Sequence, residues 1–348
     1  MKIKKTIYLL LSTVISTFLY ANTIPIVNVT AFWGFLDDPK ITQTIENKCK
    51  VKFSHDAYYT NAEFLDTFNH RKSDYDVMIF SNLIYGSVKN QLPKFNSNLW
   101  EASNNYYPYF KNYYQTHGYA HNVAYFTHAM VGFLYNPKII DITKHQNIFD
   151  IFKNAKNNYV VLVDDSGEIG NMVTEAYKVK DKDNKQTKLT YKNLKSLTQN
   201  SRVFITNDFG KIYNDPKFAF AYIWSGDALL LIKKYPKQYK FIMPLNATSI
   251  CTDLVVQMKD TPQAKCVAQE LASPKLLKYF ENDSYYFSPY FKNEVNDKSY
   301  TEVYNQTMEN LPHYNMIMPV HDFEEYYNNE WENVKLQYHN DADLNKIN

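Results

Sequence analysis

The stretch Phe218–Tyr235, FAFAYIWSGDALLLIKKY, decides the fold class of this chain. Its first part, up to Trp224, contains only alanine, isoleucine and aromatic residues, which predicts a buried strand. We expect a helix over Asp227–Tyr235, directly after this strand. A strand that leads straight into a helix is the repeating unit of α/β proteins. The stretch therefore predicts an α/β fold.

Strands and helices alternate along the rest of the chain in the same way. Further strands are predicted over Ile24–Thr30, Lys50–Phe53, Tyr75–Phe80, Phe126–Tyr135, Tyr159–Val163 and Leu254–Met258. A helical stretch separates the first two, a helix begins at Asp165, and Thr261–Asn282 is helical, with Pro274 opening its second half. This alternation predicts largely parallel sheets. The polar, lysine-rich stretch Lys178–Lys192 is predicted to be a solvated loop.

Length and composition restrict the class of protein. A chain of 348 residues suggests two domains, and 45% apolar with 21% charged residues is the balance of a globular protein with a core. These figures exclude disordered, collagen-like and polytopic membrane proteins. The net charge of +2 gives no reason to expect nucleic acid as a partner. The 8 glycines argue against glycine-rich phosphate loops, whereas 31 tyrosines can line a wet cleft.

The first residues have the layout of a secretory signal peptide. Residues 1–21 combine a basic start, an apolar run over Ile7–Tyr20 and the small residue Ala21. The alternative is an uncleaved membrane anchor, but the run is shorter than the roughly 20 apolar residues that a membrane span needs. We therefore expect a soluble mature protein that is exported to the periplasm.

Cysteines and histidines give weaker signals. Three cysteines allow at most one disulfide, and one conceivable pairing joins Cys251 with Cys266. His117, His121 and His128 are close in sequence, but no carboxylate or cysteine completes a recognisable ligand pattern. We predict no metal and no cofactor.

Acidic, aromatic and hydroxyl residues stand at the ends of the predicted strands. They are Trp33, Ser81, Asp165 with Glu168, Trp224 with Asp227, and Asp253, which we expect at the start of its strand. Open α/β sheets bind ligands just beyond the carboxyl ends of their strands. Each residue has a structural alternative, since Asp165 and Glu168 fit a capping box, Asp227 fits a helix cap and tryptophans belong to many cores. Their recurrence at strand ends favours a ligand cleft.

Several carboxylates together with several aromatic faces suit an organic polycation. Carboxylates accept charge-assisted hydrogen bonds from ammonium groups. Aromatic rings hold the alkyl chain and attract its cationic ends, by about 0.5–2 kcal/mol for each good contact. No cluster of lysine or arginine accompanies these acids, which argues against an anionic ligand.

The mature chain resembles the periplasmic spermidine/putrescine-binding component of ABC transporters, within the type II periplasmic binding proteins. The matching stretches, in family order, are Phe32-Trp33, Tyr75-Asp76 through Ser81, Val163 through Glu168, Ile223 through Ala228, Cys251-Thr252-Asp253 and Tyr286 through Pro289. The resemblance implies a two-lobed α/β protein without enzymatic activity. Its expected partners are a polyamine or other small organic cation and the permease subunits of an ABC transporter in the inner membrane. We expect a monomer.

The resemblance also implies roles for individual residues. Aromatic walls of the cleft are expected from Trp33, Trp224 and Tyr286, a hydroxyl from Ser81, and carboxylates for the amino groups from Asp165, Glu168, Asp227 and Asp253. The acid at Asp227 resembles the putrescine-preferring branch. Leu36 and Leu83 stand where the family usually has tyrosine, and Cys251 stands where an aromatic residue is common. Tyr85 could supply a substitute ring.

The binding acids occur in both halves of the chain, so only a cleft between lobes brings them together. We expect one lobe over residues 25–130 and 252–300 and the other over 131–251 and 301–348. Two other functions stay open. Tyrosine doublets such as Tyr285-Tyr286 resemble those of ferric-ion-binding proteins of the same fold, and Asp165 with Glu168 could act as the acid and base of a secreted hydrolase.

Overall fold

In a computed structural model of the chain, the described residues are 24–178, 190–209, 215–292, 295–319, 322 and 327–347. The predicted signal peptide at residues 1–21 lies outside this range, as does most of the predicted loop 178–192. Within the described part, no helix combines the length and the apolar character that crossing a bilayer requires.

The described strands form one curved sheet of ten strands, with its main path in the order β2-β1-β3-β9-β4-β7-β5-β6. Their bounds are β1 (Ile26–Phe32), β2 (Lys52–Tyr58), β3 (Val77–Ser81), β4 (Val123–Tyr135), β5 (Tyr159–Leu162), β6 (Arg202–Ile205), β7 (Phe218–Trp224), β8 (Lys240–Ile242), β9 (Ser249–Gln257) and β10 (Asn315–Met316). The predicted α/β alternation is confirmed. The expectation of a largely parallel sheet is wrong at the centre. There, β4 and β9 run antiparallel to each other, β9 also pairs antiparallel with β3, and β4 pairs antiparallel with β7 and β8.

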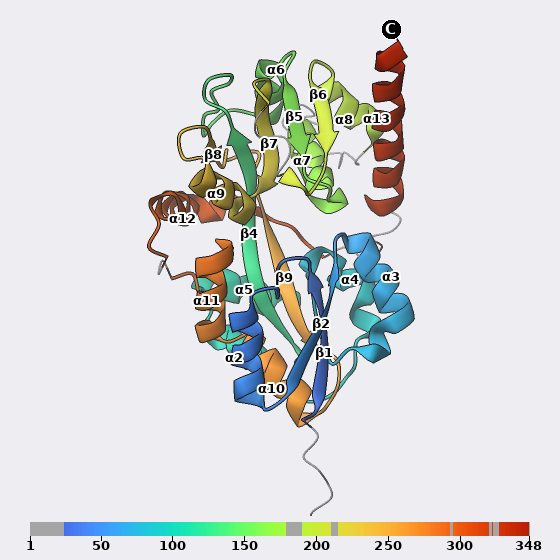
Figure 1. The fold of residues 1–348 in the computed structure, drawn as a ribbon, viewed down its shortest axis with the longest axis vertical. Coiled ribbons are helices and arrows are strands. Elements are labelled where there is room, and N and C mark those ends of the chain that lie inside the picture. The colour runs from blue at the N-terminus through green and yellow to red at the C-terminus, as the bar shows by residue number, and fades with distance from the viewer. Residues whose placement is uncertain are drawn as a thin grey trace, which may run out of the picture.

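The long strands β4 and β9 connect two lobes (Figure 1). β9 pairs with β3 over residues 253–257, and β4 pairs with β7 over residues 131–135. The first lobe contains β1, β2 and β3, and the second contains β5, β6, β7 and β8 (Figure 1). The chain thus passes from the first lobe to the second through β4 and returns through β9.

Helices cover both lobes. Their bounds are α2 (Pro39–Cys49), α3 (Asn61–Arg71), α4 (Tyr85–Val88), α5 (Pro108–His117), α6 (Ile148–Asn154), α7 (Ser166–Lys178), α8 (Tyr191–Thr198), α9 (Ser225–Lys234), α10 (Pro262–Leu271), α11 (Pro274–Ser284), α12 (Lys298–Asn310) and α13 (Asn329–Ile347). In Figure 1, α2, α3, α10 and α11 surround the first lobe, while α6, α7, α8 and α13 surround the second.

The sequence of β7 explains its place in the core. Every residue of Phe218–Trp224 is buried, and the same holds for all of β4. A strand with apolar residues at consecutive positions is stable only where both faces of the sheet are covered. The predicted strand over Phe218–Trp224 is confirmed, with the same bounds.

The starts of α11 and α9 differ in how they are capped. Ser273 accepts a hydrogen bond from the backbone of Leu276, and Pro274 is the first residue of α11, so the predicted break within 261–282 is confirmed. The predicted start of a helix at Asp227 is two residues late, because α9 begins at Ser225 and no side chain caps it. Asp227 lies within the first turn and is therefore not a helix cap.

A disulfide joins Cys49, the last residue of α2, to Cys266 in α10, and Cys251 is free. The suggested pairing of Cys251 with Cys266 is therefore wrong. Both bonded cysteines belong to helices of the first lobe, but 217 positions separate them in sequence. The bond ties the part of the first lobe before β4 to the part after β9.

The variant with Cys49→Ser and Cys266→Ser together should lose about 2–4 kcal/mol of unfolding free energy, because the disulfide restricts the unfolded chain over a long loop. Urea unfolding of the oxidised protein and the variant measures this difference. Cys251→Ser is the matched control that removes a thiol and leaves the disulfide in place. Equal urea midpoints for the double variant and the control would contradict the stabilising role.

Candidate functional site

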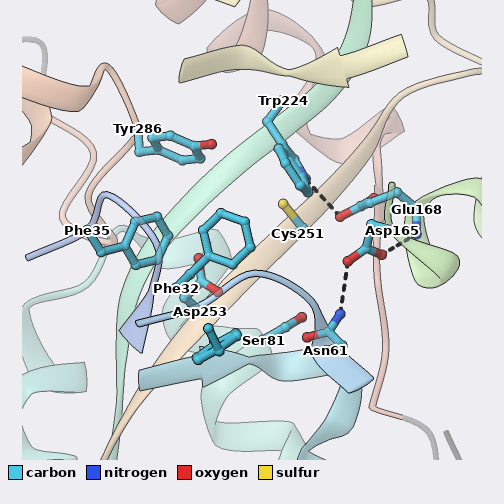
Figure 2. A pocket seen from close by; sticks show the side chains of 11 residues that line it. Phe32, Phe35, Asn61, Ser81, Asp165, Glu168, Trp224, Cys251, Asp253 and Tyr286 are labelled. Carbon is cyan, nitrogen blue, oxygen red and sulfur yellow. Dashed lines mark hydrogen bonds between the residues drawn. The ribbon is translucent and has the colours of Figure 1, made fainter. Parts of the chain in front are cut away.

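A cavity of about 40 Å³ lies where the two lobes meet. The carboxyl ends of β1, β2 and β3 approach it from the first lobe, and those of β5 and β7 approach it from the second. The cavity is lined by Phe32, Phe35, Tyr58, Asn61, Ser81, Asp165, Glu168, Trp224, Cys251, Asp253 and Tyr286 (Figure 2). Carboxylates and aromatic rings thus dominate the lining.

Six of the eight residues predicted for the site line this cavity. They are Ser81, Asp165, Glu168, Trp224, Asp253 and Tyr286. Asp227 does not line the cavity but accepts a hydrogen bond from Tyr286, which does. Trp33 is outside the cavity.

Asp165 stands just before α7 and accepts three hydrogen bonds. Its Oδ1 accepts from the backbone N–H of Gly167 at 2.9 Å and of Glu168 at 3.0 Å, so it caps the helix as predicted. Its Oδ2 accepts from the Asn61 amide of the first lobe at 2.9 Å (Figure 2). One carboxylate therefore serves both the helix start and the contact between the lobes.

Glu168 is almost fully buried and points into the cavity instead of completing a capping box. Its Oε1 accepts from the Trp224 indole N–H at 3.3 Å, and its Oε2 accepts from the Ser249 hydroxyl at 3.4 Å. Figure 2 shows Glu168 next to Asp165 at one end of the cavity. The two carboxyl groups repel each other, which is one cause of the raised pKa of Glu168.

Asp253 reaches the cavity from within β9. We expected it at the start of a strand, which is wrong because β9 already begins at Ser249. Asp253 is paired with Ser81 across the antiparallel ladder of β3 and β9, so both reach the cavity from neighbouring positions. The Thr127 hydroxyl donates to Asp253 Oδ2 at 3.0 Å. This single neutral donor is the only hydrogen bond that the described residues give to its carboxylate.

Tyr286, a lining residue of the cavity, is hydrogen-bonded to Asp227 of α9. The Tyr286 hydroxyl donates to Asp227 Oδ2 at 2.8 Å. The Tyr286 ring lies against Gly226, where a Cβ atom would come within 2.4 Å of two ring carbons. Only glycine at this position allows the ring to lie so close to the start of α9.

Trp33 is 53% exposed and stacks on Tyr59 at a centroid distance of 5.9 Å. Its neighbour Phe32 takes the place in the cavity that we expected for Trp33, and contacts Trp224 at a centroid distance of 5.9 Å. Adjacent residues of a strand point to opposite sides, so an error of one position selects the wrong ring. The prediction that Trp33 walls the cleft is not supported by its position.

Sequence reasoning missed Phe35, Tyr58 and Asn61 as lining residues. The predicted strand stopped at Phe53, whereas β2 continues to Tyr58, and Asn61 then begins α3. If the predicted strand had been extended to the aromatic pair Tyr58-Tyr59, Tyr58 and Asn61 would have been expected at a strand end. Cys251, which stands where an aromatic residue is common in the family that the sequence resembles, also lines the cavity.

The two leucines that depart from the family pattern lie in the core, as does Tyr85. Leu36 is buried, and Leu83 lies so close to Gly167 that a Cβ atom there would overlap the leucine methyl group. The Tyr85 hydroxyl accepts a hydrogen bond from the backbone of Ala120 at 3.1 Å, and its ring packs on Tyr119. Tyr85 therefore does not replace a missing ring of the cavity.

The carboxyl groups of the site have no cation beside them among the described ion pairs, and burial disfavours their ionised forms. Burial raises the pKa of Asp165 and of Asp227 to about 6, that of Asp253 to about 7 and that of Glu168 to about 8. Among the ion pairs of the described residues, none includes any of these four groups. A ligand with positive charges would favour their ionised forms and supply the missing partner.

Neither the family models nor the curated proteins include a match to this sequence. Among solved structures, the chain is similar to the spermidine/putrescine ABC transporter substrate-binding protein PotD of Streptococcus pneumoniae, with 17% identity, a TM-score of 0.69 and coverage of 90% of this chain and 98% of that one. For the PotD lipoprotein of Treponema pallidum, the identity is 13% and the TM-score is 0.69, with coverage of 89% of this chain and 99% of that one. For iron-bound HitA of Pseudomonas aeruginosa, the identity is 14% and the TM-score is 0.59, with coverage of 79% of this chain and 89% of that one.

These identities are low, so the similarity establishes the fold and not the ligand. The fold is the two-lobed α/β fold of type II periplasmic binding proteins, with a cleft between discontinuous lobes, as predicted. The cavity described above occupies this cleft.

Without a ligand, the charge of Glu168 should destabilise the protein at higher pH. Its pKa rises from 4.5 to about 8 on folding, so its contribution to stability is fully present below 4.5 and is lost as the pH rises through 8. The variant Glu168→Gln lacks this contribution. Between about pH 5 and pH 8, we expect the wild type to lose on the order of 2 kcal/mol more unfolding free energy than the variant does.

Urea unfolding of both proteins at several pH values measures this difference. Burial lowers the pKa of His128 to about 3, which gives an opposite pH dependence, but this contribution is the same in both proteins and cancels. Parallel stability curves for the wild type and Glu168→Gln would show that Glu168 is not the destabilising group.

Proposed function

We propose that this chain is a periplasmic solute-binding protein that captures a polyamine and delivers it to the permease of an ABC transporter in the inner membrane. The observation that carries the proposal is a cavity with three carboxyl groups, Asp165, Glu168 and Asp253, that no described cation neutralises. Burying such charge is costly unless a ligand compensates it. The signal-peptide layout of residues 1–21 supports export.

The arrangement of the cavity favours a short diamine such as putrescine over spermidine. One ammonium group would lie at Asp165 and Glu168, and the other at Asp253. Between them, Phe32, Phe35 and Tyr286 form a continuous aromatic wall, with ring centroids 5.6 and 5.8 Å apart along the series. Such rings hold a methylene chain and attract the ammonium groups at its ends. The lining thus offers two acidic positions with an aromatic wall between them, which matches the two ammonium groups of a diamine.

The lobes are proposed to comprise residues 25–130 and 252–300, and residues 131–251 and 301–348. The crossings through β4 and β9 and the disulfide within the first lobe support these boundaries. The Asn61–Asp165 and Tyr286–Asp227 hydrogen bonds then join one lobe to the other. We infer that they form when the lobes close and break when the cleft opens to admit the ligand.

Two other functions receive less support. HitA is an iron-bound protein of the same fold, but the Tyr285 hydroxyl donates to Asp297 and the Tyr286 hydroxyl to Asp227, so this doublet offers no pair of phenolates to one ion. Within the described residues, no group of three or more histidine, cysteine or acidic side chains could hold a metal. We propose no catalytic role for Asp165, because its two oxygens already accept three hydrogen bonds, from the start of α7 and from Asn61.

Calorimetric titration of the purified mature protein with putrescine, cadaverine, spermidine and a quaternary amine tests this function. We expect the diamines to bind most tightly. The Asp253→Asn variant should bind putrescine about 2–4 kcal/mol more weakly, because an ammonium group then lies in the closed cleft without its anion. The control Asp260→Asn neutralises an exposed aspartate seven positions away and should bind like the wild type. Absence of binding heat from every amine would refute the polyamine assignment.

Asp227 should act on the ligand through Tyr286. Each of Asp227→Ala and Tyr286→Phe should weaken putrescine binding, because either change removes the 2.8 Å hydrogen bond between these two side chains. The two changes together should weaken binding by no more than the larger single effect, since they break the same contact. A double-mutant cycle by calorimetry measures this coupling. Additive losses would place Asp227 in direct contact with the ligand instead.

A further inference from the structure

A second, smaller cavity of about 20 Å³ adjoins the candidate site. Both cavities are lined by Asn61 and Asp165, so they lie on the two sides of the hydrogen bond that joins these residues. The lining of this second cavity also includes Asp164 and three residues of the C-terminal helix α13, namely Trp331, Glu332 and Lys335. We call this space the side cavity.

The side cavity already contains an ammonium group of the protein itself. Lys335 Nζ lies 3.3 Å from Asp164 Oδ1 and 2.9 Å from Glu332 Oε1, and the lysine side chain is 22% exposed. The Trp331 indole N–H donates to Asp164 Oδ1 at 2.7 Å and fixes the orientation of this carboxylate. Burial alone would lower the pKa of Lys335, but hydrogen bonding and attraction by Glu332 and Asp164 raise it. The ammonium group is therefore charged.

The lysine side chain has the same chemistry as one end of the proposed ligand. It is an alkyl chain that ends in an ammonium group, here held by two carboxylates next to an indole. Asp165 is the only charged group shared by the two cavities. A ligand that extended past Asp165 would place its next ammonium group beside Asp164 and Glu332.

We propose that Lys335 determines the length of ligand that the site accepts, by occupying the position that the third amine of a triamine would take. This inference rests on the proposed function and deepens it. Two ammonium groups cannot share one pair of carboxylates without repulsion, so the lysine excludes the third amine. Asn61 lines both cavities and donates to Asp165, and an ammonium group can replace its neutral amide there because it forms the stronger hydrogen bond with a carboxylate.

The variant Lys335→Ala tests this proposal. Removal of the lysine frees Asp164 and Glu332 for the ligand, so the Kd for spermidine should fall by about tenfold, the gain expected from one charge-assisted hydrogen bond. The Kd for putrescine should stay within about threefold of the wild type, because a diamine does not reach the side cavity. Calorimetric titration of both proteins with both amines measures the two ratios.

Matched variants separate this effect from a general change of charge. Lys259→Ala also removes a lysine that pairs with a mostly buried aspartate, Asp76 at 3.2 Å, but away from both cavities, and should leave both Kd values unchanged. Adding Asp164→Asn to Lys335→Ala removes the carboxylate that would receive the third amine, so the gain for spermidine should disappear. If Lys335→Ala fails to bind putrescine, the titrations are made with Lys335→Met instead. Methionine keeps an unbranched side chain at this position but has no ammonium group.

An unchanged spermidine Kd in a variant that still binds putrescine would overturn the role of Lys335 and leave the proposed function intact. An equal gain in Lys259→Ala would also overturn it, because the cause would then be net charge. Failure of the wild type to bind any amine would instead refute the proposed function. The three outcomes are therefore distinguishable.

Discussion

The structure of the cleft depends on three carboxyl groups that are buried with no cation beside them among the described residues. Asp165, Glu168 and Asp253 accept hydrogen bonds only from neutral donors of the described chain, namely amides, an indole and hydroxyl groups. Such donors reduce the cost of burying a carboxylate but do not balance its charge. The aromatic side chains around them keep the cavity away from bulk water, which increases that cost further. The cationic ligand proposed above would remove this cost.

The two antiparallel strands at the centre allow this charge to be gathered in one place. Because β4 and β9 run through both lobes, β9 can place Asp253 opposite Ser81 of the first lobe while its beginning pairs with β4 near the second lobe. Asp165 and Glu168 arrive from the end of β5 and the start of α7. No single lobe contains all three carboxylates, so an open cleft separates them and a closed one concentrates them.

The sequence predicts the elements and most of the site because both depend on local patterns. The apolar run of β7 and the acidic residues after β5 are visible without tertiary information. The choice between Phe32 and Trp33 depends on which face of β1 is turned to the cleft, and neighbouring residues cannot settle it. The pairing of Cys49 with Cys266 depends on α2 lying beside α10, which is a matter of tertiary packing. The choice of ring and the disulfide pairing failed because they required knowledge of distant segments, whereas the errors at the start of α9, the start of β9 and the end of β2 concern the bounds of elements.

The neighbouring acids Asp164 and Asp165 show how the second lobe keeps the cleft negative. Asp164 is neutralised by Lys335 and held by Trp331, both from α13, whereas Asp165 faces the cavity with neutral partners. If both carboxylates were unpaired, their repulsion would oppose the ionised form of Asp165 and weaken its attraction for a cation. If Lys335 paired with Asp165 instead, the site would lose a charge that the ligand needs. The helix α13 therefore has to dock where it neutralises one acid and leaves the next one free.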